Sequence, residues 1–188
     1  KFALTTLAVM AAVGVLAVQP ADAKKVQQDP VVSPIEMPMN DEIQQVNGVS
    51  KATNKETQRL SNKLADATKA MVKKNWKTIY VKAVPTGDKA AVRFYYVDTR
   101  GEVHNGQVIR NTGLSKGKYM TGSLRQAEAL QELVNHLERT GQEVPSSIDI
   151  IITQGGYRSK TIFNYDEDTS NLPAYQQQYE QQNFPTMK

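Results

Sequence analysis

Alternation of apolar and polar side chains marks three segments of the chain, residues 76–84, 90–97 and 102–110. A period of two residues is typical of strands that bury one face. Only two short turn-forming stretches, 85–88 and 98–101, separate the three segments. Connections of this length join antiparallel neighbours, so the sequence predicts a three-stranded meander. The third strand is the weakest, because Asn105-Gly106 interrupts it.

Amphipathic helices are expected on either side of this meander. The first begins at Thr53, which forms a capping box with Glu56, and the second begins at Ser123, which pairs in the same way with Gln126. Residues 111–122 are expected to form a loop, and Gly141 ends the second helix. The two predicted apolar stripes are Leu60, Leu64, Ala67 and Met71, and Leu124, Ala127, Leu130, Leu133, Val134 and Leu137.

Two further strands, residues 147–153 and 157–165, turn at Gly155-Gly156. Pro173 then opens a short helix in which Tyr175 and Tyr179 lie one turn apart. The predicted order is α-β-β-β-α-β-β-α. It specifies an α+β fold, an antiparallel five-stranded sheet packed by two helices with a short C-terminal helix added.

The N-terminal part reads as an export signal followed by a linker. Residues 1–23 combine Lys1, the apolar run from Phe2 to Val18, and Ala21-Asp22-Ala23, which has the small-residue pattern of a cleavage site. We expect cleavage before Lys24 and a periplasmic product in a Gram-negative host. A membrane anchor is the alternative, but a run of this length is marginal for a bilayer core of roughly 30 Å.

Residues 24–52 contain Pro30, Pro34 and Pro38 and lack a helical or alternating pattern. They are expected to be an extended leader, either without structure of its own or serving as a spacer or docking strand. Residues 53–188 then form a single domain. The chain contains no cysteine, which excludes disulfides and thiolate metal sites.

Charge is distributed unevenly along the chain. The net charge is +4, but residues 24–120 carry 17 basic and 9 acidic side chains, whereas residues 121–188 carry 5 basic and 9 acidic ones. Such asymmetry steers partners more than it shapes folds. A general nucleic-acid binder fits poorly, because the acidic half would repel phosphate and the basic residues are spread singly.

Motifs for catalysis or cofactor binding are not found in the sequence. His104 and His136 have no metal-ligand spacing around them, and His136 is expected on the helix surface near its C-terminus. No nucleophile elbow, Walker loop or dinucleotide fingerprint occurs. The triplet Asp166-Glu167-Asp168 could hold a hard cation, but it lacks the remaining elements of an EF-hand. We therefore predict no catalytic, cofactor or metal site and no enzymatic activity.

The same triplet suits the recognition of a cationic protein, because aromatic residues lie on both sides of it. The predicted partner-binding residues are Tyr165, Asp166, Glu167, Asp168, Tyr175 and Tyr179. A solvated strand end with an Asx turn is the alternative for the triplet. A different hypothesis is an envelope scaffold or stress protein that contacts an anionic surface through Lys55, Arg59, Lys63 and Lys73 of the first helix.

Four stretches carry a resemblance to a known family: NWKTIYVKAV, VRFYYVDTRGEV, LVNHLERTGQEVPSSIDIIITQGGYRSKTIFNYDED and LPAYQQQYEQQNF. With the order of elements, they resemble YezG-type immunity proteins from about Glu56 to Phe184. The resemblance implies stoichiometric occlusion of a polymorphic toxin, commonly a nuclease, without a cofactor. Together with the export signal, it predicts a toxin that acts on the envelope or is intercepted in transit.

Overall fold

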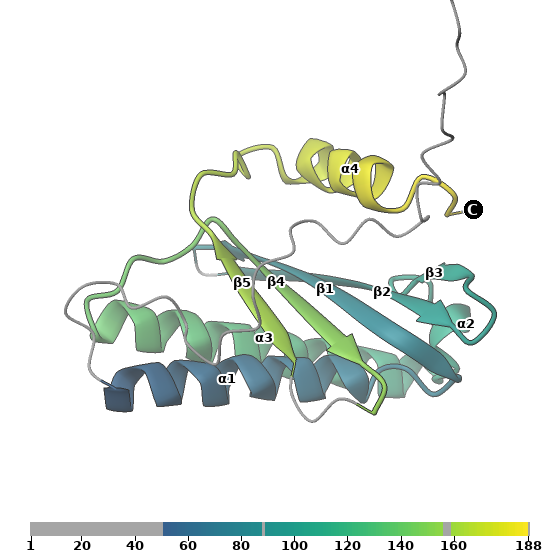
Figure 1. Ribbon diagram of the computed structural model, residues 1–188, viewed down its shortest axis with the longest axis horizontal. Coiled ribbons are helices and arrows are strands. Elements are labelled where there is room, and N and C mark those ends of the chain that lie inside the picture. Colours follow the sequence, from purple (N-terminus) through teal and green to yellow (C-terminus); the bar gives the residue numbers. More distant parts are fainter. Residues whose placement is uncertain (1–50, 88, 156–158, 188) are drawn as a thin grey trace, which may run out of the picture.

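The computed structural model describes residues 51–87, 89–155 and 159–187. In this part of the chain, a five-stranded antiparallel sheet has two long helices on one face and one shorter helix on the other (Figure 1). The elements in chain order are α1 (Lys51–Lys69), β1 (Trp76–Thr86), β2 (Lys89–Asp98), β3 (Val103–Asn105), α2 (Ile109–Thr112), α3 (Lys116–Arg139), β4 (Ser147–Thr153), β5 (Lys160–Asn164) and α4 (Leu172–Asn183).

The strand order β3-β2-β1-β4-β5 confirms the predicted α+β class and the predicted meander. β4 pairs with β1 on the side opposite β2, so the chain crosses the helical face between β3 and β4. At the centre, Val81 stands between Phe94 of β2 and Ile150 of β4. These side chains are buried against α1 and α3 and form the middle of the hydrophobic core.

α1 and α3 pack antiparallel across the core face. Near one end of the pair, His136 Nε2 lies 3.1 Å from Thr57 Oγ1, and toward the other end Gln126 Nε2 donates to Thr68 Oγ1 at 2.9 Å. His136 is only 7% exposed, so its predicted position on the helix surface is wrong. The side chain points at α1, where a hydroxyl satisfies a ring nitrogen that burial removes from water.

The predicted start of the second helix is also wrong. α3 begins at Lys116 after Ser115, and the expected loop 111–122 holds α2 and the first turns of α3. Tyr119 packs into the core, and Gly122 lies so close to Met71, two residues after the end of α1, that a Cβ there would approach its sulfur to 1.9 Å. Contacts with the rest of the fold therefore extend the helix through a stretch that has no apolar stripe. Leu124, predicted to be internal, is 59% exposed.

Other boundaries differ by smaller amounts. β3 ends at Asn105, whose side chain accepts a hydrogen bond from the Gln107 amide at 2.8 Å, so the predicted strand 102–110 is cut short. α1 begins at Lys51, two residues before Thr53. α4 begins at Leu172, with Asn171 as its N-cap.

Some expectations fall on parts of the chain outside the described residues. The signal peptide (1–23), nearly all of the leader (24–52) and Tyr157 at the start of the last predicted strand belong to this group. Among the described helices, none combines the length and the apolar character needed to cross a membrane.

Candidate partner-binding site

α4 lies over the second face of the sheet (Figure 1). Polar and charged side chains occupy the middle of this face. Strand alternation directs one set of side chains away from α1 and α3, toward α4. This set comprises Tyr80 and Lys82 from β1, Arg93 and Tyr95 from β2, and Asp149 from β4.

Lys82 is the centre of this face and is only 3% exposed. It stands opposite Asp149 in the register of β1 and β4, and its Nζ lies 2.9 Å from Asp149 Oδ2 and 3.1 Å from Glu167 Oε2. The same ammonium group lies 4.9 Å from the ring centroid of Tyr179 and 5.5 Å from that of Tyr175. Burial alone disfavours the charged amine, but Asp149 and Tyr175 outweigh it and raise the pKa of Lys82. The ammonium group therefore stays charged inside the protein.

Glu167 ties the loop after β5 to this centre. Its carboxylate accepts hydrogen bonds from the Ser147 and Tyr175 hydroxyls as well as from Lys82, and its backbone amide donates to Ser146 Oγ at 3.1 Å. Burial favours the neutral acid, but the hydrogen bonds from Ser147 and Tyr175 and the charge of Lys82 together lower the pKa of Glu167. The carboxylate is thus ionised and held by contacts within the molecule.

An aromatic cluster and a second carboxylate fix the remaining length of α4. The ring centroids of Tyr95 and Phe184 lie 4.5 Å apart, and Tyr179 lies 6.0 Å from each of them. Glu180 accepts from the Tyr95 hydroxyl at 2.7 Å and pairs with Arg93 at 3.2 Å. Burial raises the pKa of both Tyr95 and Tyr179, so these phenols remain neutral.

The structure thus separates the predicted partner-binding residues into two groups. Glu167, Tyr175 and Tyr179 face inward and hold α4 on the sheet. Tyr165, Asp166 and Asp168 lie at the surface, and Tyr165 is 41% exposed. Partner binding by any of the six stays a prediction.

Asp168 has a structural task of its own in the exposed loop. Its carboxylate accepts hydrogen bonds from the amide and the hydroxyl of Ser170, which lower the pKa of Asp168. This is the Asx-turn geometry named as the alternative for the acidic triplet. It gives the loop a defined shape and leaves Asp166 on the surface beside it.

The sequence analysis missed the groups on which Glu167 depends, namely Lys82, Asp149, Ser147 and Asn164. Asn164 Nδ2 donates to Asp149 Oδ2 at 2.7 Å and to Ser147 Oγ at 3.0 Å. One signal was present in the sequence: Lys82 and Asp149 each interrupt a strand whose neighbouring residues are apolar. Two opposite charges in central strands indicate an internal ion pair.

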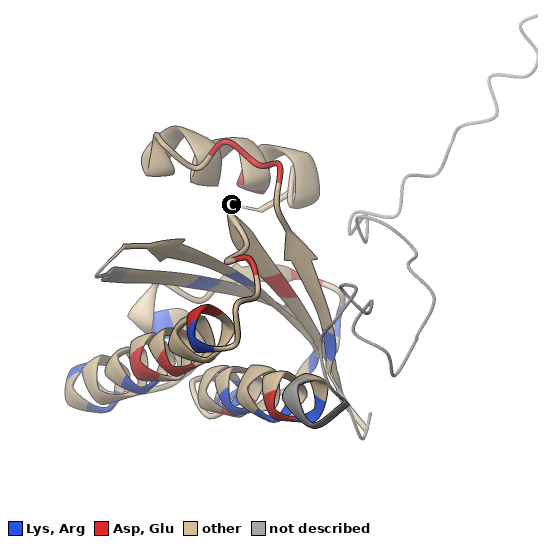
Figure 2. Cartoon of the chain, turned by 90° about the vertical axis from the view of Figure 1, so that its left-hand side faces the viewer, with Lys and Arg blue, Asp and Glu red and all other residues tan. Residues whose placement is uncertain are grey.

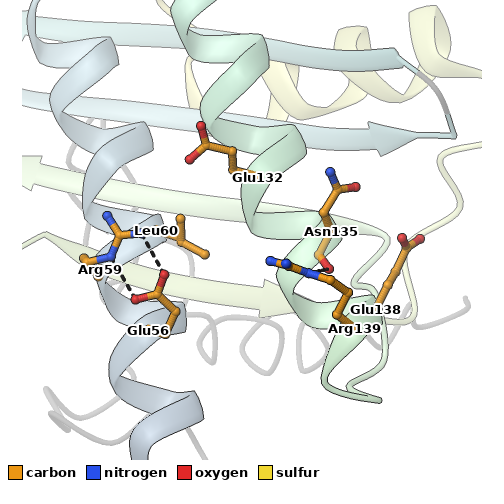
Figure 3. A pocket seen from close by; sticks show the side chains of 7 residues that line it. All are labelled: Glu56, Arg59, Leu60, Glu132, Asn135, Glu138 and Arg139. Carbon is orange, nitrogen blue, oxygen red and sulfur yellow. Dashed lines mark hydrogen bonds and ion pairs between the residues drawn. The ribbon is translucent and has the colours of Figure 1, made fainter.

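A groove of about 470 Å³ runs over the outer side of the helix pair (Figure 3). Its lining is Glu56, Arg59, Leu60, Glu132, Asn135, Glu138 and Arg139. Arg59 pairs with Glu56 at 2.7 Å, and Lys63 bridges the helices to Glu132 at 2.6 Å. Two of the four cations assigned to an anionic-surface contact are therefore neutralised within the molecule.

The turn between β2 and β3 brings Asp98, Glu102 and His104 together, with one potential ligand atom from each within 4.8 Å of the others. Asp98 Oδ1 accepts from the amides of Arg100 and Glu102, and Oδ2 lies 3.1 Å from His104 Nε2. These bonds account for the cluster as the closure of a tight turn. A cation held there would have to compete with them for Asp98.

Charged residues gather on the two long helices, and an acidic stretch lies in the loop that leads to α4 (Figure 2). The fold and this distribution define a small α+β protein. One polar network, centred on Lys82, fixes its C-terminal helix, and the other charged side chains lie outside this network. Over residues 57–187 the chain matches the family described as "Immunity protein YezG-like", and it belongs to that family. A comparison with curated proteins found no match.

The match runs from α1 to the residues after α4 and confirms the resemblance drawn from the sequence. The family indicates an immunity or antitoxin role. Proteins of this kind generally act without catalysis and imply a toxin as partner.

Proposed function

We propose that the chain is an exported immunity protein that binds a cognate protein toxin and neutralises it by stoichiometric occlusion. The observation that carries this proposal is the family match over residues 57–187, which includes the whole sheet, α3, α4 and most of α1. Inhibition of this kind needs only a rigid complementary surface. The network of Lys82, Asp149 and Glu167 provides rigidity on the side of α4.

The contact surface that we propose is the exposed loop after β5. Asp166 and Asp168 supply negative charge for electrostatic steering, and Tyr165 supplies apolar area beside them. Tyr175, Tyr179 and Glu167 support this surface from below, because their side chains are engaged with the sheet. A preorganised loop loses less entropy on binding than a mobile one.

The proposed site of action is the periplasm. Support comes from the signal-peptide pattern of residues 1–23. A toxin met there either acts on the cell envelope or is intercepted while it crosses, so an envelope-directed toxin is the partner we expect.

The first test is rescue of growth. If the neighbouring gene encodes a toxin-like domain, that domain is directed to the periplasm, with and without the immunity protein, and the purified pair is examined for a 1:1 complex. Growth only in the presence of the immunity protein supports the proposal. Unrelieved toxicity together with no complex would reject it.

The second test concerns the surface and uses charge reversal. Asp166→Lys combined with Asp168→Lys is expected to slow association with the toxin roughly 10-fold at low salt, since steering of this size is common for charged interfaces. Glu128→Lys with Glu138→Lys makes the same change in net charge on exposed positions of α3 and is the matched control. Equal slowing by both pairs would show that net charge alone matters, and no slowing by the first pair would remove the loop from the interface.

A further inference from the structure

Two large apolar side chains of α3 point into solvent. Met120 and Leu124 are each 59% exposed and lie one helical turn apart, so they form a single apolar strip. Val108, just before α2, is 38% exposed. Isolated exposed apolar residues are ordinary, but an adjacent pair on one helix face marks a possible contact surface.

Basic residues gather at the end of the molecule where α1 ends and α3 begins, and of these Lys116 lies one helical turn from Met120. The exposed basic residues there include Lys73, Lys74, Arg110, Lys116, Lys118 and Arg125. The amide of Lys73 donates to Thr112 O at 2.8 Å, and a Cβ at Gly113 would lie 3.4 Å from Lys73 Cβ, so the end of α1 touches the junction of α2 and α3. We call these six cations, with Val108, Met120 and Leu124, the basic end.

Within the described part of the chain, no ion pair compensates the charge of the basic end. None of its six cations forms an ion pair with another residue of the described ranges, and no acidic residue occurs between Glu102 and Glu128 in the sequence. The N-terminus of α3 adds the positive end of a helix dipole. An occupant of this surface must therefore be both acidic and apolar.

Residues 26–50, which lie outside the described residues, have this composition. They contain Asp29, Glu36, Asp41 and Glu42 but no lysine or arginine. Their apolar side chains include Val31, Val32, Ile35, Met37 and Met39. Both the sign of the charge and the apolar content are complementary to the basic end.

The segment is also long enough to reach the basic end. α1 has 19 residues and therefore spans about 28 Å, and the basic end lies beyond its C-terminal end. About ten extended residues cover that distance at ~3.3 Å per residue. Residues 41–50 can therefore run back along α1, leaving residues 29–40 free to lie over α3.

We propose that residues 29–40 dock on the basic end, with the apolar residues of Val31–Met39 covering Met120 and Leu124. The acidic side chains then face the lysines at the start of α3. The docked segment shields an uncompensated cationic surface from other anions in the envelope. This intramolecular contact does not depend on the identity of the toxin, so its test is independent of the growth rescue described above.

The absence of cysteine in the chain allows a site-specific spin label. Met37→Cys is labelled with a nitroxide in the chain from Lys24 onward, and paramagnetic broadening of backbone amides is recorded. We expect the amides of residues 116–125 to lose most of their intensity and those of residues 132–139 to keep theirs. Broadening spread evenly over the domain, or no broadening at all, would overturn the proposal.

A label at Ser50→Cys is the matched control, because residue 50 directly precedes α1 in the sequence and the label should broaden the last turns of α3 instead. Lys116→Glu with Lys118→Glu, and separately Leu124→Asp, should each abolish the broadening caused by the Met37 label. All three positions are exposed, and unchanged amide shifts in the sheet verify that the variants fold. Broadening that persists in both variants would contradict docking at this surface.

A second copy of the chain is the competing occupant. A mixture of spin-labelled protein without ¹⁵N and ¹⁵N-labelled protein without a spin label separates the two cases. Broadening at residues 116–125 in this mixture would assign the surface to self-association and overturn the intramolecular contact. Its absence, with broadening in the doubly labelled chain, supports the proposal.

Discussion

The buried pair of Lys82 and Asp149 is the residue-scale feature on which the polar face of the sheet depends. Lys82 Nζ has two carboxylates within 3.1 Å, whereas Asp149 Oδ2 receives hydrogen bonds from both Lys82 and Asn164. A buried ion pair contributes little net stability compared with a well-packed apolar pair, because both ions are desolvated. Removing one partner is different, since it leaves the other charge buried and uncompensated.

Lys82→Met should therefore lower the free energy of unfolding by about 3–5 kcal/mol. The methionine keeps most of the volume but leaves Asp149 and Glu167 without their cation. Urea unfolding measures the loss. The double variant Lys82→Met with Asp149→Leu should recover a large part of it, and a single variant as stable as the parent would show that Asp149 finds another partner.

The lowest pH at which α4 stays packed on the sheet is expected to depend on Glu167. The pKa of this carboxyl is lowered in the folded state, so its contribution is present above the unfolded value of about 4.3 and is lost as the pH falls through the folded value. Amide exchange of α4, measured relative to that of the central strands, should therefore accelerate below about pH 4.

Glu167→Gln should remove most of this pH dependence and loosen α4 already at neutral pH, because the amide cannot attract Lys82 in the same way. Glu143→Gln, at an exposed position outside the network, is the matched control. If α4 in Glu167→Gln loosens with acid just as the parent does, another carboxylate controls the docking.

At the scale of elements, a glycine decides how the edge of the meander closes. Gly106 follows β3, its amide donates to Phe94 O at 2.8 Å, and a Cβ at this position would lie 2.2 Å from the Phe94 ring. Phe94 is fully buried in the core, so its ring has little room to move. The short third strand and the turn into α2 therefore require glycine for close approach.

Gly106→Ala should destabilise the fold by about 1–3 kcal/mol, the range for overpacking in a core. Chemical denaturation measures it. Gly117→Ala serves as the control, because Gly117 lies in the first turn of α3 with open space around its Cβ position. That substitution should stabilise the protein by roughly 0.5–1 kcal/mol through helix propensity. If Gly106→Ala left the free energy of unfolding unchanged, the Phe94 ring would have to shift freely.

Elements whose sequence carries a clear period were predictable. β4 spans Ser147–Thr153 as expected, and the alternation in β1 correctly separates the core-facing Val81 from Lys82. The start of α3 was not predictable, because residues 116–122 carry polar and glycine residues without an apolar stripe. Their helical state depends on contacts of Tyr119 and Gly122 with distant parts of the chain.

The candidate site also has features that the sequence predicted and features that it could not. From the acidic and aromatic composition of residues 165–168 we predicted a partner-binding segment, and the structure places Tyr165 and Asp166 on the surface. The inward orientation of Glu167 could not be derived locally, because its partner Lys82 lies 85 residues away in the sequence. Long-range register between β1, β4 and the loop after β5 decides which of three adjacent acids is internal.

For the whole molecule, α3 separates two surfaces of opposite charge. The basic end lies at the N-terminus of α3. The acidic loop follows β5. Asn164, the last residue of β5, pairs with Ser147, and Ser147 begins β4 shortly after the C-terminus of α3. The 24 residues of α3 span about 36 Å. This exceeds the Debye length of about 8 Å at physiological ionic strength, so each surface interacts with partners independently of the other.

Truncation tests whether α4 belongs to the cooperative unit. Removal of residues 172–188 deletes the aromatic rings that pack on Tyr80 and Tyr95. It also deletes Tyr175 and Tyr179, whose rings lie beside the ammonium group of Lys82. We expect a lower denaturation midpoint, a smaller denaturant dependence because less surface is buried, and binding of an apolar dye to the exposed face. Removal of residues 185–188 alone is the matched control and should leave the transition unchanged, since Phe184 is retained. If the longer truncation unfolded like the parent, α4 would be an appendage, and the rigid support proposed for the acidic loop would be wrong.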